Sequence, residues 1–163
     1  MEAFVKTVYR LSDLDWQLIS DALAFAAPYS QSLKRAAAPI NQRSRDVAGF
    51  VDEINASLDT LIDSSFTVRA KTFTSLDDWL FVEISKTGFH LNSNTEPANA
   101  ALLATQLADT GSFWTTQLRV QIGPAHWLIG QPRQARYWSK TKARLLALEL
   151  SEAGLFSSNK EHE

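Results

Sequence analysis

The hydrophobic period of this sequence changes at Ser65, and that change constrains the fold more than any other feature. Before it, over 40–63, apolar residues recur at alternating four- and three-residue spacing, which predicts one long amphipathic helix. The residues of this stripe are Val47, Val51, Ile54, Leu58 and Leu61. After it, over 65–71, apolar and polar residues alternate, which predicts a strand with one buried face. The chain therefore combines helices with a sheet.

Capping residues predict three further helices. Ser12 and Asp15 form a capping box at the start of a helix expected over about 13–27. An alanine- and leucine-rich segment at 98–109 follows a threonine and a proline, both of which favour a helix start. Ser139 caps a last helix, whose apolar residues recur at i, i+3, i+4 and i+7. Helices thus precede, separate and follow the strands.

The segments with a period of two predict two strand meanders. The expected strands lie at 65–71, 79–84, 89–92, 114–122, 126–129 and 133–138. The run Gly-Gln-Pro at 130–132 is interpreted as a turn between the last two strands. This order predicts an α+β domain, in which about four helices, two of them N-terminal, pack on an antiparallel sheet. The side chains expected in the core are Val47, Val51, Ile54, Leu58, Leu118, Val120, Leu146 and Ala147.

The composition fits one domain of ordinary size. Of 163 residues, 45% are hydrophobic and 21% charged, so we expect a single domain at 1–156 and a disordered polar tail at 157–163. Cysteine is absent, which excludes disulfides and thiolate metal sites from this sequence. The first residues lack the apolar run of a signal peptide, and the longest apolar run, 22–28, is too short to span a bilayer. We therefore expect a cytoplasmic protein.

Charge is distributed unevenly along the chain. Residues 110–148 carry six cations and no acid, although the chain contains 18 acids in total. Aromatic rings are interleaved with these cations, and this mixture suits a nucleic acid, because rings stack on bases and cations neutralise phosphates. The residues expected to contact DNA or RNA are Arg119, Arg133, Arg136, Tyr137, Trp138, Lys140, Lys142 and Arg144. In the alternative interpretation, the cations are a solvated face that balances the acidic helix, and the tryptophans belong to the core.

The last helix opens with the run Ser139-Lys140-Thr141-Lys142-Ala143-Arg144-Leu145-Leu146-Ala147. Together with the preceding strands, over 113–153, this run resembles the end of a double-stranded-RNA-binding domain. The resemblance implies that Lys140 and Arg144 contact phosphates across a groove, while Ala143 and Ala147 pack on the sheet. The DNA-binding domains of phage integrases have similar helix starts, so both DNA and RNA are kept as expected partners.

Two other functions follow from other parts of the sequence. The amphipathic helix at 40–63 offers a stripe for a protein partner, so the chain is an adaptor or a homodimer in this interpretation. Asp77, Asp78, Glu83 and Lys86 include the residue types of a metal-dependent nuclease. In a regular strand, however, Glu83 and Lys86 point to opposite faces, and one β-bulge is needed to bring them together.

The common catalytic motifs are absent from the sequence. Six scattered glycines form neither a phosphate-binding loop nor a dinucleotide-binding motif. His90, His126 and His162 are too far apart in the sequence to suggest a zinc site, and no GxSxG motif marks a serine nucleophile. We therefore expect a non-enzymatic binding module without catalytic residues, metal or cofactor, which contacts nucleic-acid phosphates through the face at 110–148.

Overall fold

The computed structural model describes residues 2–25, 37–62, 65–73, 76–87, 97–110, 116–123 and 125–153. The helices are α1 (Glu2–Tyr9), α2 (Asp13–Phe25), α4 (Arg45–Ile62), α5 (Pro97–Thr110) and α6 (Lys140–Glu152), with a 3-10 helix η1 (Ala135–Tyr137). The strands are β1 (Phe66–Lys71), β2 (Trp79–Lys86), β3 (Leu118–Gly123) and β4 (His126–Pro132). These strands form one antiparallel sheet in the order β1-β2-β4-β3, which confirms the predicted α+β class.

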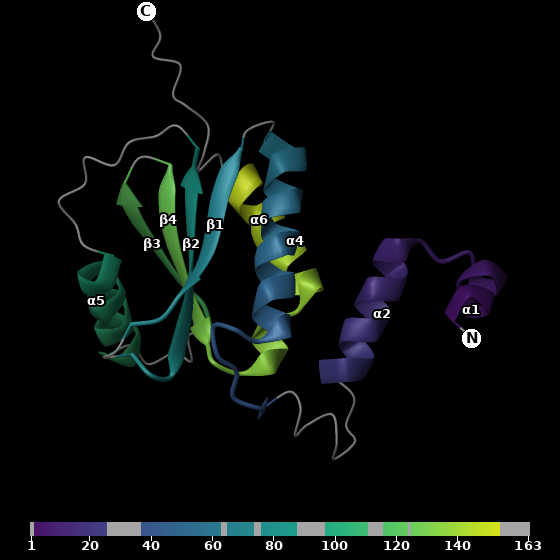
Figure 1. Cartoon of the computed structure of the whole chain (residues 1–163), viewed down its shortest axis with the longest axis horizontal. Coiled ribbons are helices and arrows are strands. Elements are labelled where there is room, and N and C mark those ends of the chain that lie inside the picture. The colour runs from purple at the N-terminus through teal and green to yellow at the C-terminus, as the bar shows by residue number, and fades with distance from the viewer. Residues whose placement is uncertain are drawn as a thin grey trace, which may run out of the picture.

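Helices α4 and α6 cover one face of the sheet (Figure 1). Both helices turn their apolar stripes inward, as the sequence predicts. The buried residues of the two stripes are Val47, Phe50, Ile54 and Leu58 of α4, and Ala143, Leu146, Ala147 and Leu150 of α6. The stripe of the helix predicted at 40–63 therefore lies in the core of its own domain. Of its large apolar residues, Leu61 at the end is the one that is exposed.

Helix α5 covers the opposite face of the sheet (Figure 1). Its buried residues Ala100 and Ala101 pack in a second cluster. The other buried members of this cluster are Leu76, Phe81, Leu118, Ile122 and Leu128. The two clusters together confirm the predicted core: six of the eight expected side chains are buried, and the other two, Val51 and Val120, are partly buried.

Two predictions at the end of β4 are wrong. The run at 130–132 does not turn the chain but continues the strand, where Gly130 pairs with Phe81 and Pro132 with Trp79. A Cβ built on Gly130 would lie 2.6 Å from an atom of the Phe81 ring, so the glycine is there for close packing rather than for a turn. The strand predicted at 133–138 is a bend followed by η1, because the N–H groups of residues 137 and 138 donate to carbonyls three residues back.

The helix predicted at 40–63 begins later than expected, at Arg45. The residues before it are held to the segment after β4 instead: the Ile40 N–H donates to the Arg133 carbonyl at 3.1 Å, and Pro39 forms a β-bridge with Gln134. Ser44 then starts the helix, since its Oγ accepts a hydrogen bond from the Val47 N–H. The start of α4 is thereby placed beside the segment that leads into α6.

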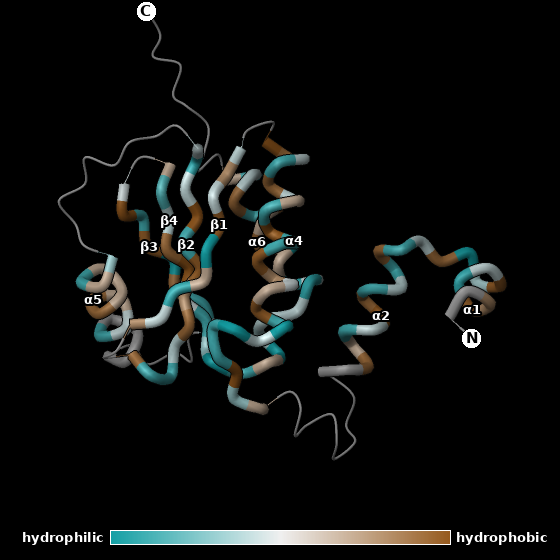
Figure 2. Tube along the Cα trace, in the orientation of Figure 1, coloured by the Kyte–Doolittle hydropathy of each residue, from teal (hydrophilic) through white to brown (hydrophobic). Residues whose placement is uncertain are grey.

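Helices α1 and α2 form an arm that projects away from the sheet (Figure 1). The predicted capping box is confirmed: the Asp15 N–H donates to Ser12 Oγ at 3.1 Å, and the Ser12 N–H donates to an Asp15 carboxylate oxygen at 2.9 Å. Figure 2 shows hydrophobic residues along both helices. The apolar side chains of the arm that are more than half exposed are Phe4, Val8, Tyr9, Leu14, Leu18 and Leu23.

Several predictions lie outside the described residues. These are the strand at 89–92, the first residues of the strand at 114–122 and the tail at 157–163. The strands predicted at 65–71, 79–84 and 126–129 are confirmed, and so is the helix predicted at 98–109. In the described part of the chain, every helix is too short or too polar to cross a lipid bilayer.

Candidate functional site

The packing of α4 against α6 determines where the cations of the chain meet. The two helices run in parallel, because Phe50 of α4 lies against Trp138 just before α6, with ring centroids 5.0 Å apart, and Glu53, one turn later, pairs with Arg144 of α6. Both helices therefore begin at the same end of the molecule, the lower end in Figure 1. Since the N-terminus of a helix carries a partial positive charge, this end is electropositive before any side chain is counted.

Positive charge increases along this seam toward the helix starts. Arg144 is half-buried and neutralised by Glu53. One turn earlier in α6, Lys140 packs across Gly49 of α4, and its Cε lies 3.5 Å from the place that a Cβ of residue 49 would occupy. A glycine has no acidic side chain that could pair with the lysine. One further turn earlier on the same face of α4 stands another cation, Arg45. Lys140 in the first turn of α6 and Arg45 in the first turn of α4 thus carry like charges at the same end of the seam.

Three more exposed cations belong to this end. Arg43 lies two residues before α4, Arg136 is in η1 and Lys142 is in the first turn of α6. Among the described residues, no acid pairs with any of them or with Arg45 or Lys140. The name basic end is used below for these five residues: Arg43, Arg45, Arg136, Lys140 and Lys142.

Tyr137 stands within the basic end and is already in contact with two of its cations. The Arg136 guanidinium lies 5.0 Å from the centroid of the tyrosine ring, and the Lys142 ammonium lies 5.4 Å from it. Such cation–π contacts hold the long side chains of both cations beside the ring. The ring itself is half-buried, so it positions charge more than it offers a free stacking surface.

The N-terminus of α6 is capped by two side chains. Ser139 accepts a hydrogen bond from the Lys142 N–H at 3.3 Å, which confirms the predicted cap. Asp21 of the arm accepts another from the Thr141 N–H at 3.0 Å. Its second carboxylate oxygen accepts from the side-chain amide of Gln17 at 3.0 Å. A carboxylate from elsewhere in the chain therefore accepts a hydrogen bond from the first turn of α6.

The structure separates the residues predicted to contact nucleic acid into two groups. Arg136, Tyr137, Lys140 and Lys142 lie together at the basic end. Three others are used within the fold: Arg119 of β3 pairs with Glu149 of α6, Arg144 pairs with Glu53, and Trp138 is 1% exposed and donates from its indole N–H to the Pro132 carbonyl. The Trp138 ring is therefore not accessible for stacking on a base.

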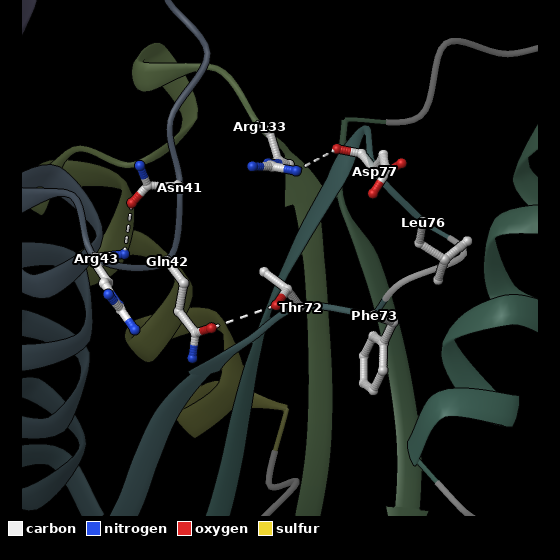
Figure 3. Close-up of a pocket in the computed structure, with 8 residues that line it drawn as sticks. All are labelled: Asn41, Gln42, Arg43, Thr72, Phe73, Leu76, Asp77 and Arg133. Atoms are coloured by element: carbon white, nitrogen blue, oxygen red, sulfur yellow. Dashed lines mark hydrogen bonds between the residues drawn. The ribbon is translucent and has the colours of Figure 1, made fainter.

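Arg133, the remaining predicted residue, lines a cleft of about 450 Å³ next to the basic end (Figure 3). Its guanidinium is fixed by two carbonyls, those of Ile40 at 3.0 Å and Asp77 at 2.8 Å. Both partners are backbone carbonyls, so neither hydrogen bond neutralises the charge of the guanidinium. Arg43 of the basic end lines the same cleft, while the exposed Asp77 carboxylate adds one negative charge to it.

The other walls of this cleft are polar side chains that mainly hold the loops together. The Asn41 carboxamide oxygen accepts from the Arg43 N–H at 2.9 Å, and the Thr72 hydroxyl donates to Gln42 at 3.4 Å (Figure 3). Phe73 and Leu76 supply its apolar part. With two cations and one acid, the cleft continues the positive surface of the basic end more weakly.

A second polar cluster lies on the α5 face of the sheet. The Glu83 carboxylate of β2 accepts from the Lys71 ammonium at 2.6 Å and from His126 Nε2 at 2.8 Å. Because a carboxylate only accepts, His126 Nε2 carries the proton, and its buried Nδ1 has no partner among the described residues. Burial raises the pKa of the Glu83 carboxyl, but the hydrogen bonds and charges of Lys71 and His126 together lower it further, so the pKa lies below its ordinary value.

The geometry of β2 does not bring the nuclease residues together. Its pairing with β1 runs without a bulge from Phe81 to Lys86, so Glu83 and Lys86 point to opposite faces of the sheet. Asp77 and Asp78 form the exposed turn before the strand. In the described part of the chain, no three His, Asp or Glu side chains converge as metal ligands would.

Sequence reasoning missed Arg43 and Arg45 as members of the candidate site. They lie far along the chain from 110–148, in a region with a net negative charge. No pattern in the sequence shows that α4 and α6 pack in parallel with their starts together, and only that packing brings these two arginines to the lysines of α6.

A comparison with known protein families, with curated proteins and with solved structures found no match to this chain.

Proposed function

We propose that this chain is a binding module that contacts the phosphates of a nucleic acid with its basic end. The observation that carries the proposal is the parallel packing of α4 and α6, which gathers five exposed cations from two distant segments around two helix N-termini. Like charges on neighbouring turns repel one another, and a polyanion relieves that repulsion when it binds.

The chemistry of the basic end favours phosphates over bases. Trp138 is buried, and Tyr137 is half-buried with two cations beside its ring, so little aromatic surface is left for stacking. Phosphate contacts position a nucleic acid without reading its sequence. The proposed binding is therefore weak in sequence preference, and it applies to DNA and RNA alike.

The test compares a triple variant with a charge-matched control. Arg45→Gln, Lys140→Gln and Lys142→Gln together remove three of the five cations of the basic end. Each neutralised phosphate contributes about −0.9 to the slope of log K against log salt on duplex DNA, so five cations limit the slope to about −4.5. We expect the triple variant to lose more than half of the wild-type slope and to bind more weakly in fluorescence anisotropy at about 50 mM salt.

The control is the triple change Arg69→Gln, Lys86→Gln and Arg119→Gln, which removes the same charge from strands of the sheet. It should bind nearly as the wild type does, because the lost charges lie outside the basic end. Equal losses in the two triple variants would show a general effect of net charge and would contradict the proposed site. The absence of any salt-sensitive binding by the wild type to duplex or single-stranded DNA or RNA would contradict the function itself.

A further inference from the structure

The arm contributes an acid to the basic end, in addition to Asp46 in the first turn of α4. Asp21 of α2 places one carboxylate oxygen 3.0 Å from the Thr141 N–H in the first turn of α6, and Gln17 of α2 holds the other oxygen. Thr141 lies between Lys140 and Lys142, two cations of the basic end. The carboxylate therefore occupies a position where a phosphate oxygen would find an N–H group and a positive helix end, in a turn that carries two lysines.

Helix α2 is acidic as a whole. It carries Asp13, Asp15 and Asp21 and neither lysine nor arginine. Asp13 pairs with Lys6 of α1, and Asp15 is engaged in the capping box with Ser12, so these two acids serve the arm itself. Asp21 alone among the three bonds to another part of the fold, and that part is the basic end.

The arm is not built into the core. Leu14, Leu18 and Leu23 of α2 are 60%, 56% and 66% exposed, and the described arm contributes no buried residue to either core cluster. A helix that buries little apolar surface is released at little cost in free energy. The contact of Asp21 with Thr141 is therefore weak enough to be exchanged for a contact with a ligand.

We infer that α2 is an autoinhibitory strap: its Asp21 carboxylate competes with nucleic-acid phosphate for the start of α6. This inference rests on the proposed function. Phosphate binding at Thr141 requires Asp21 to leave, and the same step removes a negative charge from the first turn of α6. The strap therefore lowers the affinity of the full chain for nucleic acid and favours partners with a high phosphate density.

The test uses two variants of the full chain that lose the same charge from the same helix. Asp21→Asn weakens the contact with α6, whereas Asp13→Asn, at a side chain that is 98% exposed and paired with Lys6, leaves that contact intact. With a labelled single-stranded DNA as probe at about 50 mM salt, Asp21→Asn should bind roughly threefold to tenfold more tightly than the wild type. Asp13→Asn should differ from the wild type by less than about twofold, because exposed charges away from the site are screened.

A measurement without nucleic acid checks the contact directly. Hydrogen exchange of the Thr141 amide should be faster in Asp21→Ala than in the wild type, because the variant removes its acceptor. Unchanged exchange would overturn the strap whatever the binding data show. If the wild type binds DNA and Asp21→Asn binds no more tightly than Asp13→Asn, the strap is also overturned while the proposed function stands. If none of these proteins binds, the proposed function fails and the strap fails with it.

Discussion

The two faces of the sheet are built on different principles. The face under α4 and α6 has one large cluster of buried apolar side chains, and the Glu53–Arg144 ion pair lies at the seam between the two helices. The face under α5 is apolar only in part, because Lys71, Glu83 and His126 form a charged cluster across β1, β2 and β4. The first face therefore buries the larger apolar cluster, whereas the second contains the Glu83 carboxyl, whose lowered pKa makes stability depend on pH.

The same comparison explains where the candidate site is. A seam of two helices needs close and continuous packing, and Phe50 against Trp138 provides it next to the helix starts. Within that seam Arg144 is paired with Glu53, and the exposed cations Lys140 and Arg45 lie at its rim, beside the helix starts. On the α5 face, Lys71, Glu83 and His126 are paired with one another, so they are not offered to a ligand in the same way.

Removing Trp138 should have the largest effect. The ring is 1% exposed and packs on Phe50, so Trp138→Ala leaves a cavity in the first face and should cost about 3–5 kcal/mol of unfolding free energy. Denaturant unfolding followed by circular dichroism measures this loss. Retained stability together with weaker nucleic-acid binding would mean that the ring faces a ligand, and it would break the contrast between a structural seam and a functional rim.

The two glycines at packing contacts should respond in opposite directions. In Gly130→Ala on the α5 face, the new methyl group meets the Phe81 ring at 2.6 Å, and Phe73 lies edge-on to that ring at 5.2 Å, so the variant should lose about 1–3 kcal/mol. In Gly49→Ala on the α4 and α6 face, the methyl group only touches Lys140 Cε at 3.5 Å, and the variant should gain up to about 1 kcal/mol from helix propensity. Thermal unfolding of both variants and the wild type measures the two changes in stability. Changes of the same sign would contradict the packing described for Phe81.

The charged cluster should contribute least, and only above a certain pH. Since the pKa of Glu83 is lower in the folded chain than its ordinary value of 4.5, its stabilising effect is complete above that value and is lost as the pH falls through the folded pKa. Glu83→Gln should therefore cost about 1 kcal/mol near neutral pH. The difference in unfolding free energy between the wild type and this variant should shrink below about pH 4.5. A difference that is constant down to about pH 3 would contradict the linkage.

Local signals predicted most of the elements of the fold. The caps at Ser12 and Ser139 and the periodicities at 40–63 and 65–71 depend only on residues within a few positions, and each of them led to an element that the structure contains. The errors lie at 130–138, where the residues resemble a turn and a strand. There, Gly130 makes room for the Phe81 ring of another strand, and the Trp138 indole N–H donates a hydrogen bond to the Pro132 carbonyl. Contacts of this kind have no signature in a short window of sequence.

The candidate site shows the same division. The sequence by itself determined that cations gather between 110 and 148, that Ser139 begins a helix and that Lys140 and Lys142 lie in its first turn. Only the tertiary structure decided which charges are neutralised, since Arg119 and Arg144 find acids at Glu149 and Glu53, and only it brought Arg43 and Arg45 to the lysines and Asp21 onto the helix start. The physical reason is that charge is a property of each residue, whereas the interaction between two charges weakens with the distance between them in space. That distance depends on how the helices and strands pack, and the separation of two residues in the sequence does not give it.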